Sequence, residues 1–195
     1  MEPDGTKEML IGKDPLKIAE MGVSLSFVPE DRLGMGLVGN MDLTDNMMLR
    51  SFRKGKTPFV NRKPSRKLAE SVVKDLAVVT PGITTPVRRL SGGNVQKVLL
   101  GREIASSPTV LLTAYAVRGL DINSSYTIYD LINEQKKKGV AVIFVGEDLD
   151  VLLELSDKIL VLCGGEVSGI VDARNTDKNE VGMLMTRVGG RKDHE

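Results

Sequence analysis

The chain has 195 residues, of which 41% are hydrophobic and 27% are charged, and its formal net charge is +1. A chain of this length can bury a hydrophobic core, and the composition is that of a globular protein. The near-neutral balance excludes an overall polybasic nucleic-acid-binding protein, so any basic surface must be local. The one cysteine, Cys163, excludes an internal disulfide, which fits a reducing compartment.

The sequence contains no apolar run of the roughly 20 residues that a membrane-spanning helix needs. Its first residues are polar and lack the order of a signal peptide. We therefore expect a soluble protein whose association with a membrane depends on a partner.

The first half of the chain predicts short strands and helices separated by loops. Hydrophobic spacing and capping residues indicate a weak strand at 9–11, a helix from the cap Asp14 to Met21 and a strand at 23–28. A glycine-rich loop is expected at 33–40. After it we expect a brief helix from the cap Thr44 to Leu49 and two longer helices at 65–76 and 92–105.

Basic residues interleave with Phe52 and Phe59 between Arg50 and Lys67. Such interleaving can indicate a surface for single-stranded nucleic acid. A solvated loop followed by the exposed face of a helix explains the same residues, and we favour this simpler interpretation. No nucleic-acid partner is expected.

The second half alternates strands and helices, which is typical of an α/β fold with a largely parallel sheet. We expect strands at 110–112 and 140–145, helices at 124–138 and 148–155, a hairpin of strands 159–163 and 166–171 around Gly164 and Gly165, and a last helix capped by Thr176.

One segment points to an anion site. Ser91 is a typical helix N-cap residue, and Gly92 and Gly93 leave backbone N–H groups uncovered at the start of an apolar helix. The positive end of the helix dipole favours a phosphate group there. An ordinary serine-capped helix would look the same, so the segment alone does not decide.

The run Leu90-Ser91-Gly92-Gly93-Asn94-Val95-Gln96-Lys97 resembles the signature motif of ATP-binding-cassette proteins. Further stretches follow the family's order: residues 28–38 resemble its Q-loop region, 118–121 its D-loop, and 147–159 its switch region and the next strand. The form is similar to the second cassette of double-cassette importers of nucleosides or sugars, with nucleosides placed first.

The resemblance implies a RecA-like P-loop NTPase fold with an inserted helical subdomain. The α/β core is expected at 1–42 and 106–195 and the helical subdomain at 43–105, with residues 33–59 meeting a transmembrane permease. In this family two cassettes dimerise head to tail, so a signature completes the partner cassette's ATP site. The nucleotide-contacting residues implied are Leu90, Ser91, Gly92, Gly93, Asn94 and Gln96, and the dimer interface residues are Gly119, Leu120 and Asp121. ATP and Mg²⁺ are the implied cofactors of the assembled transporter, at the cytoplasmic face of the membrane.

The sequence departs from the family at the positions that the resemblance implies for ATP hydrolysis. No Gly-x-x-x-x-Gly-Lys-Ser/Thr loop occurs, and the resemblance places that loop upstream, so a truncated cassette is expected. Ala114 and Tyr115 replace the two Walker B acids, Glu147 replaces the switch histidine, and Glu30 replaces the Q-loop glutamine. No catalytic position is intact and no metal site is expected, so the chain alone should bind ATP weakly or not at all and should not hydrolyse it.

Two other functions remain open. The altered catalytic positions favour an inert, cassette-like scaffold or regulatory module that needs no nucleotide, while the retained signature counts against it. The basic segment 50–67 favours a cassette ATPase of DNA repair or translation, but the long insertions of such factors are missing.

Overall fold

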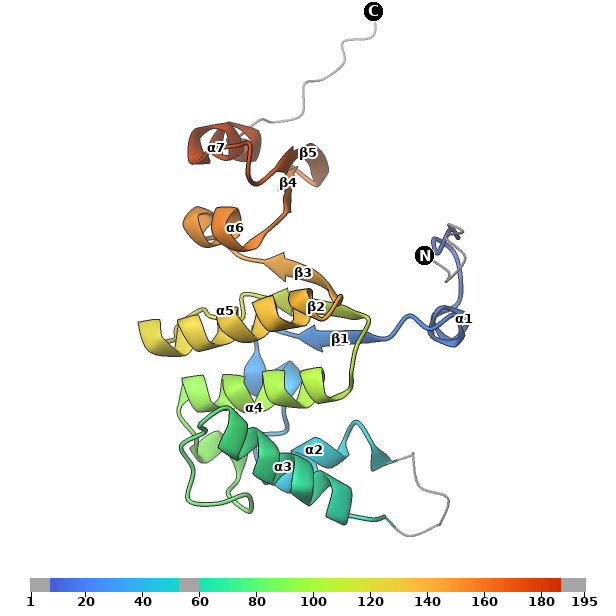
Figure 1. The fold of residues 1–195 in the computed structure, drawn as a ribbon, viewed down its shortest axis with the longest axis vertical. Helices are drawn as coiled ribbons and strands as arrows, with labels where there is room; N and C mark the ends of the chain where they lie inside the picture. The colour runs from blue at the N-terminus through green and yellow to red at the C-terminus, as the bar shows by residue number, and fades with distance from the viewer. Residues whose placement is uncertain (1–7, 53–59, 187–195) are drawn as a thin grey trace, which may run out of the picture.

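The computed structural model describes residues 8–52 and 60–186 of the chain. Its centre is a parallel sheet of β1 (Leu25–Val28), β2 (Val110–Ala114) and β3 (Ala141–Val145), in the order β1-β2-β3 (Figure 1). Leu111 of β2 lies opposite Ser26 of β1 and Val142 of β3. Parallel neighbours need crossover connections, and helices provide both of them here. The predicted α/β class is therefore confirmed.

Two helices next to this sheet carry most of the core. α4 (Gly92–Ala105) packs on β1, and α5 (Ile122–Lys137) packs on β3 and on α4. Leu99, Leu111 and Ile128 are completely buried between them. Because α4 is covered on several sides, its buried residues include the polar side chains Gln96, Arg102 and Glu103 as well as apolar ones, and its sequence shows no single apolar stripe.

A helical layer covers the far side of α4. It contains α2 (Leu43–Met48) and α3 (Lys63–Asp75), together with the short turns η1 (Arg32–Gly36, a π-helical turn) and η3 (Val87–Arg89). A Cβ atom at Gly101 of α4 would lie 2.8 Å from a methyl carbon of Val72 in α3, so glycine allows these two helices to approach closely. The predicted helical subdomain at 43–105 includes α2, α3 and α4, and its boundaries remain a prediction.

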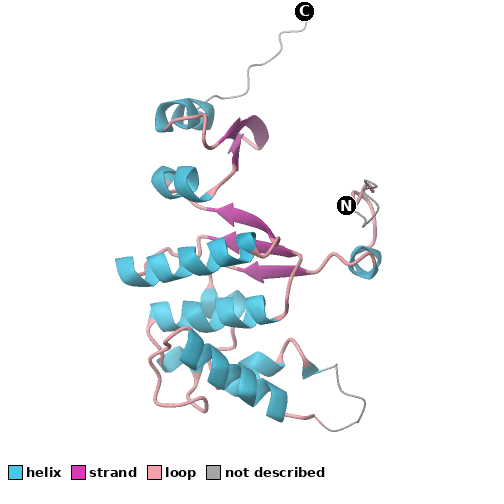
Figure 2. Ribbon diagram, in the orientation of Figure 1, coloured by secondary structure: helices cyan, strands magenta, loops and turns pink. Residues whose placement is uncertain are grey.

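The end of the described chain forms a small separate layer beyond β3 (Figure 2). It contains α6 (Leu149–Leu155), the antiparallel hairpin β4 (Lys158–Cys163) and β5 (Glu166–Asp172), and α7 (Lys178–Thr186). Gly164 and Gly165 turn the hairpin with φ of 61° and 85°, a region that glycine adopts without strain. The predicted hairpin is confirmed.

Most predicted elements occur within a few residues of their expected bounds, including α1 (Pro15–Glu20) with its cap Asp14. The strand predicted at 9–11 is wrong, because those residues pair with no strand in the described chain and end in a turn. The glycine-rich loop predicted at 33–40 contains the turn η1, which Asp31 begins by accepting a hydrogen bond from Gly34 N.

Two predicted helix caps are also wrong. Asp42 caps α2, since its carboxylate accepts the Asp45 N–H at 2.7 Å, while the buried Thr44 instead donates to the Ile83 carbonyl. The carboxylate of Asp177 accepts the Glu180 N–H at 2.9 Å, while the Thr176 hydroxyl donates to the side chain of Glu180. In both cases an aspartate within two residues of the threonine accepts the free backbone N–H instead.

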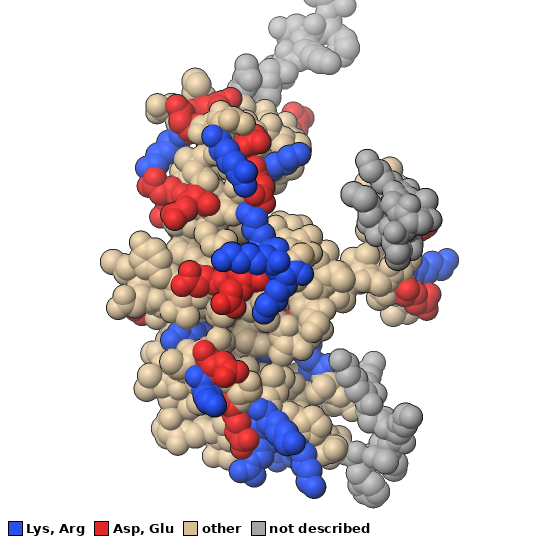
Figure 3. Space-filling model, in the orientation of Figure 1, with Lys and Arg blue, Asp and Glu red and all other residues tan. Residues whose placement is uncertain are grey.

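Three arginines in the described part of the basic segment 50–67, namely Arg50, Arg62 and Arg66, form ion pairs with acidic residues. Arg62 pairs with Asp45 at 2.5 Å and Arg66 pairs with Glu70 at 3.1 Å; residues 53–59, with Phe59, lie outside the described residues. Acidic and basic side chains are interspersed on the face seen in Figure 3. Within residues 8–52 and 60–186, no helix is long and apolar enough to cross a membrane.

Candidate functional site

Three of the positions at which the sequence departs from the family lie together at the edge of the parallel sheet formed by the carboxyl ends of its strands. Glu30 lies two residues beyond β1, Tyr115 directly follows β2, and Glu147 lies two residues beyond β3. The carboxyl ends of parallel strands are where α/β proteins commonly bind ligands. The fold therefore gathers these positions, which are far apart in the sequence, at the edge expected for a functional site.

Arg118 joins the three positions. Its Nη1 atom lies 2.7 Å from Glu30 Oε1, its Nε atom lies 3.9 Å from Glu147 Oε1, and its guanidinium lies 5.8 Å from the centre of the Tyr115 ring. The hydrogen bond with Glu30 is the main cause of the raised pKa of Arg118, followed by the charges of Glu30 and Glu147. We name these four residues the edge cluster.

Both carboxylates of the edge cluster, those of Glu30 and Glu147, already face one cation, Arg118, which would compete with a metal ion for them. All of these charged groups are solvent-exposed, so each pair contributes little to stability. Across the described residues there is no group of three or more His, Cys, Asp or Glu side chains that could hold a metal ion.

The two positions that correspond to the Walker B acids, Ala114 and Tyr115, lie at the carboxyl end of β2, the central strand of the parallel sheet. Ala114 is the last residue of β2 and lies opposite Val145, and its methyl group offers no ligand to magnesium-bound water. Tyr115 has a φ of 50°, unusual for a residue other than glycine, and its N–H donates to the Val145 carbonyl at 2.9 Å. A phenol is protonated at neutral pH and is a poor base for activating water.

The signature segment (residues 90–97) forms the start of α4, as predicted. Ser91 is the N-cap, but its hydroxyl accepts no hydrogen bond from a backbone N–H of the first helical turn. Instead, Asn94 Nδ2 donates to Ser91 Oγ at 2.8 Å, while Asn94 Oδ1 accepts from Val79 N at 2.9 Å. Ser91 and Gly92 are exposed and Leu90 is half-buried, so this helix start is open to solvent.

The signature segment touches the D-loop segment (residues 118–121). A Cβ atom at Gly93 would lie 2.6 Å from Ser124 Oγ, and one at Gly92 would lie 3.5 Å from Arg32 Nη1 and 3.8 Å from Leu120. Gly119 turns the chain with a φ of 70° just before Leu120 and Asp121. The implied nucleotide-contacting glycines and the implied interface residues thus form one continuous surface.

Asp121 is the N-cap of α5. Its carboxylate accepts the Ser124 N–H at 2.9 Å and the Ser124 hydroxyl at 2.6 Å. The hydroxyl hydrogen bond from Ser124 is the main cause that lowers the pKa of Asp121. The carboxylate is therefore committed to its own chain, although the side chain is exposed.

Gln96 and Arg32 are arranged in a way that the sequence does not reveal. Gln96 is completely buried, and its Oε1 atom accepts a hydrogen bond from Arg32 Nε at 2.7 Å, so the structure places Gln96 beneath the exposed helix start. Arg32 also donates to the Arg118 carbonyl. Arg32 was not among the predicted site residues; its position directly after Glu30 and Asp31 in the Q-loop-like region is the signal that could have identified it.

A cavity of about 360 Å³ opens beside this arginine. Its wall consists of the residues that follow β1 and of the signature segment: Glu30, Asp31, Arg32, Leu33, Leu90, Gly92 and Val95. The cavity therefore joins the exposed glycine of the signature to the edge cluster.

A larger groove of about 920 Å³ separates β3 from β4, with α6 along one side. Leu160 and Leu162 of β4 and Ile143 of β3 line it and are each more than half exposed. Within the described chain, β3 pairs with β2 alone and β4 with β5 alone, so the backbone edge of β3 faces the groove without a neighbouring strand.

Known proteins resemble this chain in sequence. The xylose import ATP-binding protein XylG of Moorella thermoacetica is 36% identical over 167 residues, which are 86% of this chain and 33% of that protein. The galactose/methyl galactoside import ATP-binding proteins MglA of Shigella boydii and Vibrio cholerae are 35% and 34% identical over 80% and 83% of this chain. The chain spans about a third of the length of these relatives. No family model matches the chain.

Solved structures share the fold. A post-hydrolysis dimer of the ATP-binding cassette MJ0796 bound to ADP and Pi superposes with a TM-score of 0.68 at 22% identity, over 85% of this chain and 70% of that one. A second dimeric structure of MJ0796, a bacterial ABC transporter cassette, gives a TM-score of 0.67. With the ordered series of motif segments and these relatives together, the chain belongs to the ATP-binding-cassette family, as a relative of the ATP-binding proteins of sugar importers.

Proposed function

We propose that this chain is a cassette unit of an importer that completes the ATP site of a partner cassette and does not hydrolyse ATP itself. The observation that carries the proposal is the contrast between two regions of one surface. The helix start at Ser91 and Gly92 is open, whereas the positions that would serve hydrolysis on its own side are replaced and paired through Arg118.

The open helix start suits the phosphate of an ATP molecule held by another cassette. Backbone N–H groups and the positive end of the α4 dipole favour an anion at Gly92. The adjoining D-loop segment, with Asp121 fixed by Ser124, gives the partner cassette a shaped surface to pack on. ATP and Mg²⁺ are proposed as ligands of the assembled pair, with the metal-binding groups supplied by the partner.

A permease contact is proposed over residues 33–59, of which 53–59 lie outside the described residues. Large apolar side chains are exposed in this stretch at a density unusual for a surface that faces only water: Leu33, Met35, Val38, Met41, Leu49 and Phe52. Through this contact the chain would lie peripherally on the cytoplasmic face of the membrane.

A sugar is the proposed solute, because the relatives named above import xylose, galactose and methyl galactoside. The sequence resemblance alone placed nucleosides before sugars. A transport assay that compares a pentose, a hexose and a nucleoside separates the two classes.

The groove between β3 and β4 is the proposed place of an upstream P-loop segment. A strand entering this groove would pair with the open edge of β3 and would cover the exposed faces of Ile143, Leu160 and Leu162.

The test is a transport and ATPase assay of the chain assembled with a cassette that holds an intact P-loop and with a permease. Gly92→Asp should abolish transport and stimulated hydrolysis, because it adds a negative charge where the phosphate would lie. Gly182→Asp is the matched control, since Gly182 is also helical and a Cβ atom there meets nothing within 4 Å. Transport that survives Gly92→Asp would favour the inert scaffold, which is supported by the edge cluster, where Arg118 pairs with both introduced carboxylates.

A further inference from the structure

The turn η1 is fastened to α4 at both of its ends. At its start, Arg32 Nε donates to Gln96 Oε1 at 2.7 Å; at its end, Arg102 Nη2 donates to the Gly36 carbonyl at 2.8 Å. Gln96 and Arg102 both belong to α4, and both are buried. Two arginine hydrogen bonds, about two helical turns apart, therefore hold one short turn against the signature helix.

Leu99 of α4 lies between these two points. A Cβ atom at Gly36 would stand 2.7 Å from Leu99 Cδ2, so the absence of a side chain at Gly36 lets the backbone of the turn rest directly on α4. Leu99 itself is completely buried. The turn and the helix are thus in van der Waals contact between the two hydrogen bonds.

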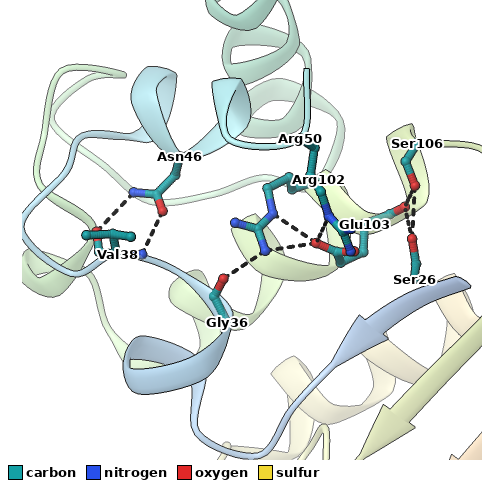
Figure 4. A network of polar contacts seen from close by, with 8 residues as sticks. All are labelled: Ser26, Gly36, Val38, Asn46, Arg50, Arg102, Glu103 and Ser106. Carbon is teal, nitrogen blue, oxygen red and sulfur yellow. Dashed lines mark hydrogen bonds and ion pairs between the residues drawn. The ribbon is translucent and has the colours of Figure 1, made fainter. Parts of the chain in front are cut away.

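A buried carboxylate fixes the arginine at the end of the turn (Figure 4). Glu103 is completely buried, and its Oε1 atom accepts from Arg102 Nε at 2.9 Å and from Arg50 Nε at 3.2 Å. Burial is the main cause that lowers the pKa of Arg102, and the charge of Glu103 opposes it. A carboxylate and a guanidinium buried together hold each other in one geometry, since neither can turn away without leaving an unpaired charge.

The same carboxylate residue connects to the sheet. The Glu103 carbonyl accepts a hydrogen bond from Ser26 Oγ of β1 at 3.0 Å and from Ser106 Oγ at 2.7 Å (Figure 4). Beyond the turn, Asn46 of α2 accepts the Val38 N–H at 2.8 Å and donates to the Val38 carbonyl at 3.1 Å. The backbone at 36–38 is held from α4 on one side and from α2 on the other.

The turn carries part of the exposed apolar surface. Leu33 and Met35 lie on η1 with 40% and 71% of their surface exposed, although the backbone of the turn is tightly held. Gly92, the first residue of α4, lies close to the start of the turn, since a Cβ atom there would be 3.5 Å from Arg32 Nη1. Leu33 and Gly92 thus line one cavity, and the hydrogen bonds of Arg32 and Arg102 join the turn that carries Leu33 to the helix that begins at Gly92.

We propose that Arg102, oriented by Glu103, is a positioning residue that holds η1 on α4 so that the two move together as one rigid body. A partner protein that displaces Leu33 and Met35 would thereby shift Gly92 and Gly93. Coupling of this kind needs a rigid element with fixed attachments at both ends, which α4 and the two arginine contacts provide. The identity of the partner as a permease rests on the proposed function. The rigid attachment of η1 to α4 does not depend on it, because it is argued from the hydrogen bonds of Arg32 and Arg102.

The experiment measures hydrogen exchange and amide chemical shifts of this chain alone, without ATP or partner. The informative amides are those of Met35, Gly36 and Leu37, whose N–H groups bond to Asp31 and Arg32 carbonyls within the turn. In Arg102→Met these amides should exchange at least about tenfold faster, and the Gly93 and Asn94 resonances should shift. Exchange at Leu111 in β2 should change less than about threefold.

Two further variants keep the test decisive. Arg102→Lys retains a cation beside Glu103 but lacks the guanidinium fork that also reaches Gly36, so the turn should loosen while the melting temperature falls less than in Arg102→Met. If Arg102→Met fails to fold, Arg32→Met removes the other attachment and should loosen the same amides. Arg66→Met, which breaks an exposed pair on α3, is the matched control and should leave both regions unchanged.

A uniform rise in exchange over the whole chain would overturn the proposal, because it would show a purely stabilising network. A loosened turn with unchanged Gly93 and Asn94 resonances would also overturn it, since the turn and the signature would then move independently. Because the readout involves no nucleotide, a failed ATPase assay bears on the proposed function and leaves this result standing.

Discussion

Arg118 Nη1 lies 2.7 Å from Glu30 Oε1, so an ion pair joins the segments that follow β2 and β1 at the carboxyl end of the parallel sheet. Glu147, beyond the third strand, faces the same guanidinium at 3.9 Å. The two introduced carboxylates thus share one cation, Arg118. This arrangement leads directly to the first prediction.

The chain alone should not release phosphate from ATP, and the double substitution Ala114→Asp with Tyr115→Glu should not change this. The restored acids would act on a nucleotide that no phosphate-binding loop holds in place. Phosphate release by the purified chain, with and without Mg²⁺, is the measurement. Magnesium-dependent turnover that Ser91→Arg leaves unaffected would contradict the prediction, because it would place ATP away from the signature.

The two signature glycines should respond differently to alanine. A Cβ atom at Gly92 meets its nearest neighbour at 3.5 Å, an ordinary contact, so Gly92→Ala should leave the thermal midpoint nearly unchanged. A Cβ atom at Gly93 would lie 2.6 Å from Ser124 Oγ and 3.1 Å from Ser124 Cβ. Gly93→Ala should therefore cost about 1–2 kcal/mol of unfolding free energy through overpacking.

Chemical denaturation of the two variants and of Gly93→Ala with Ser124→Gly checks this contrast. The second substitution removes the group that the new methyl strikes, so the double variant should recover part of the loss relative to Ser124→Gly alone. Equal stability of Gly92→Ala and Gly93→Ala would show that the signature and D-loop segments do not pack as described.

Asp121 should titrate below an ordinary aspartate. Its pKa is lowered chiefly by the hydrogen bond from the Ser124 hydroxyl. Since the folded pKa lies below the unfolded value of about 3.9, its stabilising contribution is complete above that pH and is lost as the pH falls through the folded pKa. Carboxyl chemical shifts recorded against pH measure the midpoint.

Ser124→Ala should move the Asp121 midpoint upward toward the ordinary value. Ser125→Ala is the matched control, because the Ser125 hydroxyl donates to the Asp121 carbonyl and not to its carboxylate. A midpoint that stays equally low in Ser124→Ala would mean that the hydroxyl is not the cause of the shift.

The groove between β3 and β4 should promote self-association of the chain. Leu160 and Leu162 are 53% and 64% exposed within a cavity of about 920 Å³, and apolar patches of this kind seldom remain uncovered. Replacing both leucines by lysine should shift the chain toward monomer in sedimentation velocity. Val79→Lys changes a 77% exposed side chain outside the groove and should have no such effect. A strictly monomeric parent with a sharp, reversible melt would rule the prediction out.

The sequence by itself determined the elements and the family. Capping aspartates, glycine turns and apolar periodicity depend on neighbours within a few residues, which is why α1, α4 and the hairpin at Gly164 could be predicted nearly to their ends. The ordered motif segments likewise indicated the cassette fold. The local pattern indicated Thr44 as the cap of α2, but the N-cap is Asp42, two residues earlier, because its carboxylate is the group that reaches the Asp45 N–H.

Tertiary structure alone decided which distant residues meet. Arg118 joins Glu30 to Glu147 because the parallel order β1-β2-β3 brings three strand ends to one edge, and no local pattern encodes that pairing. Gln96 is buried under Arg32, and Glu103 holds Arg102 on Gly36, because α4 is enclosed between the sheet and the helical layer. Contacts between side chains more than sixty positions apart depend on chain packing, and packing is fixed only when the whole core forms.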